Sequence, residues 1–176
     1  MANFAIKQAI DFTLKKKGES DAFLEVDFLN KSDLQIEGDT SYAKKHGSNA
    51  IAFPGAKSGT FTVEAEVANW QWLALQFGGE LSGGKKDTLT VKGVSESQSF
   101  ELSGTFKVSF DDGTPAQIMT IDMGNVSPQT NAEITFSDDE VTAFKITFDV
   151  MMDTTGNLLV MKPYVASEGL SVKSSK

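Results

Sequence analysis

The sequence predicts an all-β fold, either a two-sheet β-sandwich or a partly closed barrel, with one short flanking helix. Three observations support this: apolar residues recur with period two, helical periodicity is almost absent, and short turn motifs separate the alternating runs. From Phe100 to Phe110 every second residue is apolar or glycine, and the residues between them are Glu, Ser, Thr and Lys. Because side chains alternate across a strand, this segment predicts one buried and one solvated face.

The same alternation predicts further strands, and turn-forming residues lie between many of them. The strands are predicted at Ala22–Phe28, Phe61–Val67, Leu89–Val91, Ala132–Phe136 and Phe144–Val150. Turns are predicted at Asp111–Pro115, Gly124–Asn125, Ser137–Glu140 and Asp153–Asn157, where Asp, Asn, Gly, Ser, Thr and Pro are concentrated.

One short helix is predicted over about residues 69–77. Asn69 is a good N-cap and Gly78–Gly79 is a good C-terminal stop. The usual helical stripe comprises Trp70, Leu73, Ala74 and Phe77. Trp72 and Leu75 lie off this stripe and are also apolar, so the helix requires cover on two sides. Either it caps the open end of a sandwich with one tryptophan partly exposed, or a neighbouring subunit covers the second face.

Residues 37–59 have the weakest pattern and are predicted to form a long loop. Such loops are uncommon in compact domains and are often functional or disordered. Its apolar residues are too hydrophobic for a free linker, and they lie among glycine, serine and lysine: Tyr42, Ile51, Phe53 and Pro54. The loop is interpreted either as an arm that contacts a partner or as a long loop folded on its own domain.

The two termini of the single predicted domain, residues 1–176, are expected to be less regular. Neither period fits residues 1–18, which contain Phe4 and Ile6 and are predicted to form an N-terminal arm. Lys15–Lys17 in this segment is either a basic docking patch or a solvated turn. The small, polar residues 166–176 are expected to form a loose C-terminal tail.

Composition excludes several classes of protein. The net charge is −8, and all 16 basic residues are lysines, which disfavours phosphate binding and guanine recognition by arginine. The chain contains no cysteine, so disulfides and cysteine-ligated zinc are excluded. Because it has no apolar run of signal-peptide or membrane-spanning length, we expect no membrane insertion.

Catalytic, metal and cofactor motifs are not evident, so a non-enzymatic protein is expected. His46 is the sole histidine, and no nucleophile motif lies near it. The carboxylates at Asp111–Asp112 and Asp138–Glu140 lack the spacing of a calcium loop. The glycines at Gly78–Gly79 and Gly83–Gly84 lack the phosphate-loop arrangement. We therefore expect neither a metal nor a cofactor.

In the order of its parts, the chain resembles the major tail tube proteins of long-tailed bacteriophages. A loop bearing glycine and serine leads into the strand beginning at Gly59, the helix at Asn69–Phe77 follows, and amphipathic strands continue to Tyr164. The resemblance spans most of the chain without a diagnostic motif. It implies a β-sandwich that forms rings, typically of six subunits, which stack into a hollow tube through which DNA passes.

The resemblance also implies partners and surfaces. Copies of the chain would contact one another at sheet edges, with tail completion and baseplate proteins at the tube ends and possible association with a sheath, in a virion assembled in the bacterial cytoplasm. Candidate contacts are Tyr42, Ile51, Phe53, Pro54, Trp72, Leu75, Phe4 and Ile6. DNA would pass an acidic or neutral lumen without specific binding, and the candidate lumen residues are Glu101, Ser103, Thr105, Lys107, Lys145, Thr147 and Asp149. A related phage-like device, such as a secretion-system tube or a tailocin, is the alternative that the sequence leaves open.

A second hypothesis is a monomeric ligand-binding or carbohydrate-binding β-sandwich. Trp70 and Trp72 would then stack on sugar rings, although a flat platform is usually carried by strands or loops. A hydrolase is disfavoured because the chain has a single histidine.

Overall fold

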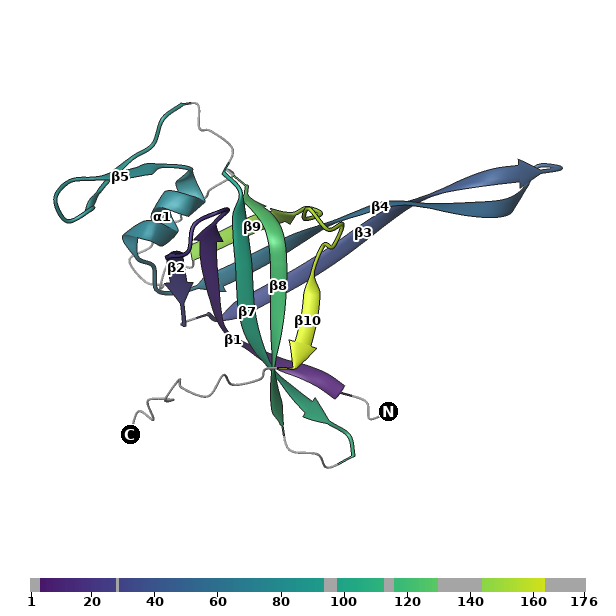
Figure 1. The fold of residues 1–176 in the computed structure, drawn as a ribbon, viewed down its shortest axis with the longest axis horizontal. Coiled ribbons are helices and arrows are strands. Elements are labelled where there is room, and N and C mark those ends of the chain that lie inside the picture. The colour runs from purple at the N-terminus through teal and green to yellow at the C-terminus, as the bar shows by residue number, and fades with distance from the viewer. Residues whose placement is uncertain (1–3, 28, 94–97, 113–115, 130–143, 164–176) are drawn as a thin grey trace, which may run out of the picture.

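The computed structural model describes residues 4–27, 29–93, 98–112, 116–129 and 144–163. Its described part contains an eight-stranded antiparallel sheet, a separate two-stranded sheet and one short helix, which confirms the all-β prediction (Figure 1). The large sheet comprises β1 (Phe4–Lys16), β2 (Ala22–Val26), β3 (Lys31–Lys45), β4 (Ser48–Ala65), β7 (Phe100–Phe110), β8 (Gln117–Pro128), β9 (Phe144–Val150) and β10 (Val160–Pro163). The small sheet comprises β5 (Glu80–Ser82) and β6 (Thr88–Thr90).

The large sheet curls so that its two halves enclose one core. Its strand order is β2-β1-β7-β8-β9-β4-β3, and the described strands do not close into a barrel. Strand β8 connects the halves: Met119–Asp122 pair with β10, and Val126–Pro128 pair with β9. Inward-facing residues of both halves belong to the same hydrophobic cluster. The two layers expected of a sandwich are therefore halves of one continuous sheet.

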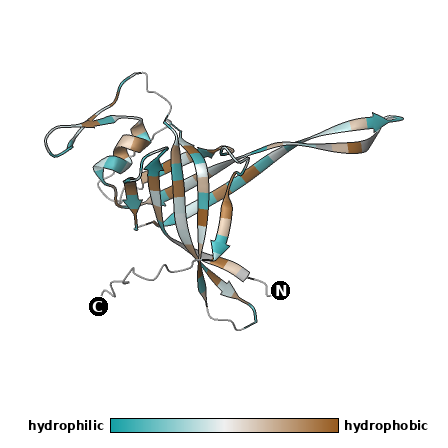
Figure 2. Cartoon of the chain, viewed as in Figure 1, coloured by the Kyte–Doolittle hydropathy of each residue, from teal (hydrophilic) through white to brown (hydrophobic). Residues whose placement is uncertain are grey.

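Strand β7 has the predicted bounds and the predicted faces. Phe100, Leu102, Phe106 and Val108 are buried in the core, whereas Glu101, Ser103 and Lys107 are exposed. Bands of hydrophobic and hydrophilic residues cross the body of the sheet in Figure 2. At Gly104 the two neighbouring strands come close, because a Cβ there would lie 3.3 Å from the backbone oxygen of Asp11. The glycine in the alternating series thus meets a packing requirement as well as preserving the pattern.

The predicted N-terminal arm is wrong, because residues 4–16 form β1, which lies between β2 and β7 in the sheet. Strand β1 pairs with β7 along its length and with β2 near its end. Register shifts lie between Ile6 and Gln8 and between Ala9 and Asp11. Each irregularity changes which residues point inward, so the strand has no single period-two pattern.

The predicted turn at Gly124–Asn125 is also wrong, since both residues lie within β8. The pairing of β7 with β8 shifts here, from Leu102 opposite Met123 to Phe100 opposite Val126. The extra residue on β8 is a β-bulge, which bends a strand without ending it. The bulge lies just before the segment of β8 that pairs with β9, so it helps the sheet turn from one half to the other.

Helix α1 (Trp70–Phe77) has the predicted ends, but apart from Ala74 its buried residues lie off the predicted stripe. Asn69 accepts a hydrogen bond from the backbone N–H of Trp72 at 2.8 Å, and Gly78 adopts the left-handed conformation at the C-cap. Trp72 is completely buried and Leu75 nearly so, whereas Trp70 is 47% exposed. The expectation that a second subunit covers Trp72 and Leu75 is wrong, because the chain's own core covers them.

The predicted long loop at residues 37–59 is wrong as well. Strands β3 and β4 run through it as one antiparallel hairpin, paired from Lys31 with Glu64 to Lys45 with Ser48. Several other predicted features lie wholly or partly outside the described residues, namely the end of the strand at Phe28, the strand at 132–136, the turn at 137–140, part of the turn at 111–115 and the tail at 166–176.

Candidate assembly surface

The β3–β4 hairpin projects from the body of the sheet (Figure 1). Its tip is the two-residue turn His46–Gly47, with φ of 51° and 83°. Positive φ at both positions is the signature of a type I′ turn, whose twist matches that of the strands it joins. His46 is therefore a turn residue, and histidine tolerates positive φ better than most residues. We refer to residues 40–54, which include this tip, as the hairpin end.

Apolar side chains are exposed on both faces of the hairpin end. Tyr42 is 51% exposed and pairs with Ala52, whereas Ile51 is 57% exposed and pairs with Ala43. Because adjacent residues on a strand point to opposite faces, Tyr42 and Ile51 lie on opposite faces. An isolated two-stranded hairpin is at best marginally stable in water. The hairpin end therefore presents a surface that a partner can cover on either side.

Two further predicted contacts lie on the same strand. Pro54 is exposed and pairs with Thr40, and Phe53 pairs with Ser41. The position of the Phe53 side chain lies outside the described part of the structure. Proline suits this part of β4, because the segment pairs with β3 whereas β9 reaches β4 only from Gly59 onward.

An apolar recess of about 330 Å³ opens between the two halves of the sheet. Its floor contains the buried side chains of Phe61, Phe106 and Ile121. Its rim includes Ile6, Leu34 and Met161, of which Ile6 is 57% exposed. The predicted contact residue Ile6 thus borders the recess, while Phe4 pairs with Phe110 at the start of β1 and its side chain is outside the described part. The term apolar recess refers below to the site lined by these six residues: Ile6, Leu34, Phe61, Phe106, Ile121 and Met161.

The residues of the recess come from β1, β3, β4, β7, β8 and β10, so no local sequence pattern identifies the recess. Ile36 was also missed, although it continues the period-two series of Leu34 and is exposed. The alternation of Leu34 and Ile36 with polar residues was the signal that could have predicted a strand here. It ends at Gly38, the next position of the series.

The candidate lumen residues divide between the outer faces of the two halves. Glu101, Ser103, Thr105 and Lys107 lie on β7, and Lys145, Thr147 and Asp149 lie on β9. The inward neighbours of both sets belong to one core, so the two outer faces look away from each other. A single lumen wall within one subunit cannot be built from both sets.

The outer face of β3, β4 and β9 is polar and acidic. Register places three rows of residues side by side on it: Lys31–Glu64–Lys145, Asp33–Thr62–Thr147 and Gln35–Thr60–Asp149. Glu37 continues the series on β3, so the described side chains include four carboxylates and two lysines. Thr62 and Thr147 share a 3.1 Å hydrogen bond, and a hydrogen bond from Lys31 to Asp33 raises the pKa of Lys31. We call this surface the acidic face.

The outer face of β1, β7, β8 and β10 is balanced in charge. Its described side chains include three carboxylates and three lysines, namely Asp11, Glu101, Asp122, Lys15, Lys107 and Lys162. Asp122 accepts a 2.6 Å hydrogen bond from Ser103 and forms a 2.7 Å ion pair with Lys162. Ile118 and Val160 are exposed on this face, which makes it less polar than the acidic face.

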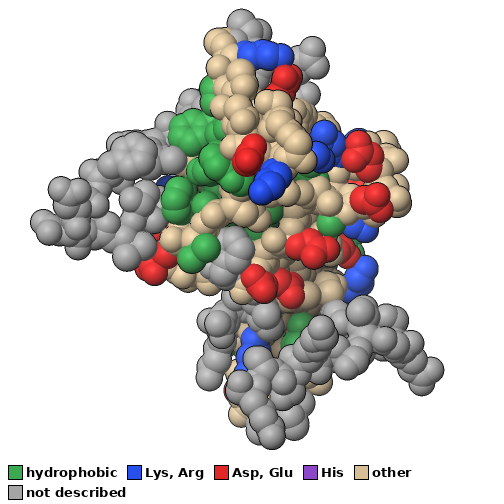
Figure 3. Space-filling model, turned by 90° about the vertical axis from the view of Figure 1, so that its left-hand side faces the viewer, with side chains coloured by type: hydrophobic (Ala, Val, Ile, Leu, Met, Phe, Trp, Pro, Cys, Tyr) green, Lys and Arg blue, Asp and Glu red, His purple; other side chains and the backbone are tan. Residues whose placement is uncertain are grey.

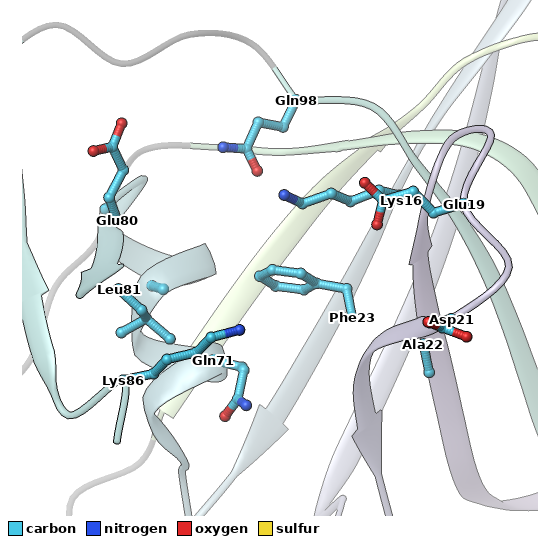
Figure 4. A pocket seen from close by; sticks show the side chains of 12 residues that line it. Lys16, Glu19, Asp21, Ala22, Phe23, Gln71, Glu80, Leu81, Lys86 and Gln98 are labelled. Atoms are coloured by element: carbon cyan, nitrogen blue, oxygen red, sulfur yellow. The ribbon is translucent and has the colours of Figure 1, made fainter. Parts of the chain in front are cut away.

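A second recess, of about 570 Å³, lies between α1, β5 and the β1–β2 turn (Figure 4). Phe23 lines it, with the Lys16 ammonium group 5.2 Å from the ring centroid and Phe100 packed against the ring. Charges of both signs surround this ring. Figure 3 shows the side of the molecule that carries α1, where hydrophobic side chains gather beside mixed charges.

The structure contradicts the hypothesis that Trp70 and Trp72 together form a platform for sugar rings. Trp72 is buried and packs beside Phe12, with ring centroids 6.2 Å apart, so it cannot stack on a ligand. Among the described residues, no group of three or more His, Asp or Glu side chains is placed to hold a metal ion. No helix in the described part is long and apolar enough to cross a membrane.

Comparisons with protein-family models and with curated protein sequences give no match. Among solved structures, the chain is similar to a chain of the sheath–tube complex of PVC, an extracellular contractile injection system, in its extended state. The TM-score is 0.47, the sequence identity is 16%, and the match covers 88% of this chain and 90% of the other. It is also similar to a chain of the tube-terminating cap of the anti-feeding prophage, with a TM-score of 0.46, 15% identity and coverage of 88% and 89%.

Proposed function

We propose that this chain is the structural subunit of a hollow tube, in which single-domain subunits form rings and the rings stack. The main support is that the hairpin end exposes apolar side chains on both of its faces, at Tyr42 and Ile51. A monomer gains nothing from extending such a hairpin into water, since folding favours burial of apolar area. In a tube, the neighbouring subunit supplies the missing cover.

The ends of the large sheet support the same proposal. Strands β2 and β3 end the strand order of the described sheet, so each has one side without a described partner strand. Exposed sheet edges readily pair with another chain. Joining different edges of successive copies is a head-to-tail contact, which forms a ring when its rotation closes. Six copies per ring is the number that the tail-tube resemblance implies.

We assign the acidic face to the lumen, with Lys145, Thr147 and Asp149 exposed to the channel. Its excess of carboxylates repels phosphates, so DNA passes without being held. The balanced face, including Glu101, Ser103, Thr105 and Lys107, then lies away from the channel. Its exposed Ile118 and Val160 are better suited to contact with protein than to a channel wall.

The tube would deliver DNA from a phage tail into the host, or act in a phage-like injection device with the same geometry. Its partners are copies of itself, the completion and baseplate proteins at its ends and, in a contractile particle, a surrounding sheath. Assembly takes place in the cytoplasm of the producing bacterium before the tube becomes part of the virion. The subunit's role is mechanical, so it needs no catalytic group.

The proposal is tested with a shortened hairpin. Replacing residues 42–52 by Asn-Gly joins Ser41 to Phe53, which already face each other in the register, through a type I′ turn. Size-exclusion chromatography with light scattering and negative-stain electron microscopy are applied to this variant and the natural chain. We expect rings or tubes from the natural chain and folded monomers from the variant.

A matched control replaces Leu81 and Leu89 by Ala in the small β5–β6 sheet, which the proposal leaves outside the subunit contacts. This control should still form tubes. A natural chain that remains monomeric at all concentrations and binds a glycan would overturn the proposal in favour of a ligand-binding sandwich. Tubes formed by the shortened variant at the same concentration would show that the hairpin is not the connector.

A further inference from the structure

The apolar recess is an unfilled site in the described part of the chain. Phe61, Phe106 and Ile121 form its floor, and the side chains of Ile6 and Met161 stand exposed at its rim. A volume of about 330 Å³ accommodates a few apolar side chains and no complete element. Its lining is mostly apolar, so the occupant should present exposed apolar side chains on a narrow support.

The hairpin end meets this requirement. It is two strands wide, and Thr40–Lys45 extends about 20 Å at the usual rise per residue. Tyr42, Ala52 and Pro54 lie on one of its faces, and Ala43 and Ile51 lie on the other. Either face can place apolar side chains on the floor of a recess that is itself open between two layers of sheet.

The hairpin end of the same molecule cannot fill the recess. Leu34 and Phe61 line the recess, and they face each other at the root of the hairpin. From this root the paired strands run away from the body, and the hairpin end lies far beyond it (Figure 1). A second copy of the chain is the source of an equivalent hairpin end.

Charge favours the same pairing. The hairpin end carries Lys44 and Lys45 and contains no acidic residue, whereas the chain as a whole has a net charge of −8. The charged residue that lines the recess is Asp11, so the lysines of a docked hairpin end would meet a negative rather than a positive charge there. Such complementarity steers association and disfavours hairpin-to-hairpin contact, in which like charges would meet.

We propose that the hairpin end of one copy docks in the apolar recess of the next. This inference rests on the proposed function and names the surfaces that join successive subunits. The contact is head-to-tail, because donor and acceptor are different surfaces, so each copy provides one of each and the contact repeats along the assembly. The hairpin end gains the cover that it lacks in the monomer.

The test uses engineered cysteines, because the natural chain contains none. One double variant combines Ile51→Cys with Met161→Cys, and a second combines Ile51→Cys with Ile6→Cys. A control combines Ile51→Cys with Val91→Cys, where Val91 is also exposed but follows β6 and does not line the recess. All replaced side chains are exposed, so the fold should be retained. Each sample receives a short bis-maleimide and is analysed by denaturing electrophoresis and electron microscopy.

We expect a ladder of covalent oligomers from at least one recess variant and no more than background dimer from the control. Tubes without a ladder in either recess variant would overturn the docking inference and leave the proposed function intact. The absence of any assembly in the natural chain would instead overturn the proposed function.

The competing occupant is the chain's own segment after Pro163. Met161→Cys is therefore labelled with a maleimide dye in the full chain and in a variant ending at Pro163, both below the assembly concentration. Equal labelling rates are expected. A rate several-fold higher in the shortened variant would assign the recess to that segment and overturn docking by a second copy.

Discussion

Strand β4 has two parts that both pair with β3 but differ in the burial of their side chains. From Gly59 to Glu64 it pairs with both β3 and β9, and Phe61, Val63 and Ala65 are buried. From Ser48 to Lys57 it pairs with β3, and its described side chains are exposed. Backbone pairing is therefore retained where burial is absent. The inner half contributes to the chain's own core, whereas we propose that the outer half contacts another molecule.

This difference means that substitutions in the two regions should change different measurements. Substitutions in the body should change the free energy of unfolding of the monomer. Substitutions in the hairpin end should leave that free energy nearly unchanged and alter the concentration at which the chain assembles.

Phe148→Ala should destabilise the monomer by about 3–5 kcal/mol, because it leaves a large cavity in the core. Phe148 is fully buried on β9 opposite Phe61. Urea unfolding followed by tryptophan fluorescence provides the measurement, at a concentration below assembly. A loss smaller than about 1 kcal/mol would mean that the body is not the stabilising region.

Asn69→Ala should lower the free energy of unfolding of the monomer by about 1 kcal/mol, because it removes the side chain that caps α1. The Asn69 carboxamide oxygen accepts from the Trp72 N–H, which holds the helix over the core. Asn69→Asp serves as the control, since its carboxylate can accept the same hydrogen bond. Equal losses in both variants of the same unfolding experiment would contradict a capping role.

Ile51→Ser should change monomer stability by no more than about 0.5 kcal/mol, as expected for an exposed position. It should nevertheless raise the concentration needed for tube formation several-fold, because the apolar side chain is lost from the contact. Light scattering across a dilution series measures this threshold. Val91→Ser, at a similarly exposed position outside the proposed contact, should leave both quantities unchanged.

The smallest effect concerns the turn after β9. Hydrogen bonds from the hydroxyl and N–H of Thr155 and from the N–H of Asn157 lower the pKa of Asp153. Its contribution to stability is therefore present above the pKa of the unfolded chain and is lost as pH falls through the lower folded value. NMR titration of Asp153 should show the lowered pKa, and Thr155→Val should raise it toward the ordinary value. An unchanged value in this variant would contradict the assigned cause.

The sequence predicted the parts of the fold in which the chain covers itself. Strands β7 and β9 have the predicted bounds because one face of each is buried and the other is solvated. Apolar and polar residues therefore alternate along both strands. The ends of α1 were predicted because Asn69 and Gly78 act locally. Its faces were not, since a two-turn helix that is apolar nearly all round does not indicate which side faces the core.

The sequence failed where cover is absent or register changes. Residues 37–59 lack alternation because neither face of the hairpin end is buried by its own chain, so glycine, serine and lysine were interpreted as a loop. Strand β1 lacks a continuous alternation of apolar and polar residues, because two irregularities interrupt its pairing with β7. Tyr42, Ile51 and Ile6 were nevertheless predicted as contact residues, and their side chains are exposed, whereas the recess depends on distant strands meeting in three dimensions.

Amide hydrogen exchange followed by mass spectrometry tests most directly whether another copy covers the hairpin end. The exchange of residues 40–54 is compared with that of residues 100–110 in the unassembled and assembled chain. We predict slow exchange of residues 100–110 in both states, and exchange of residues 40–54 that is fast in the monomer and strongly slowed on assembly. Equally fast exchange of residues 40–54 in both states would contradict the account.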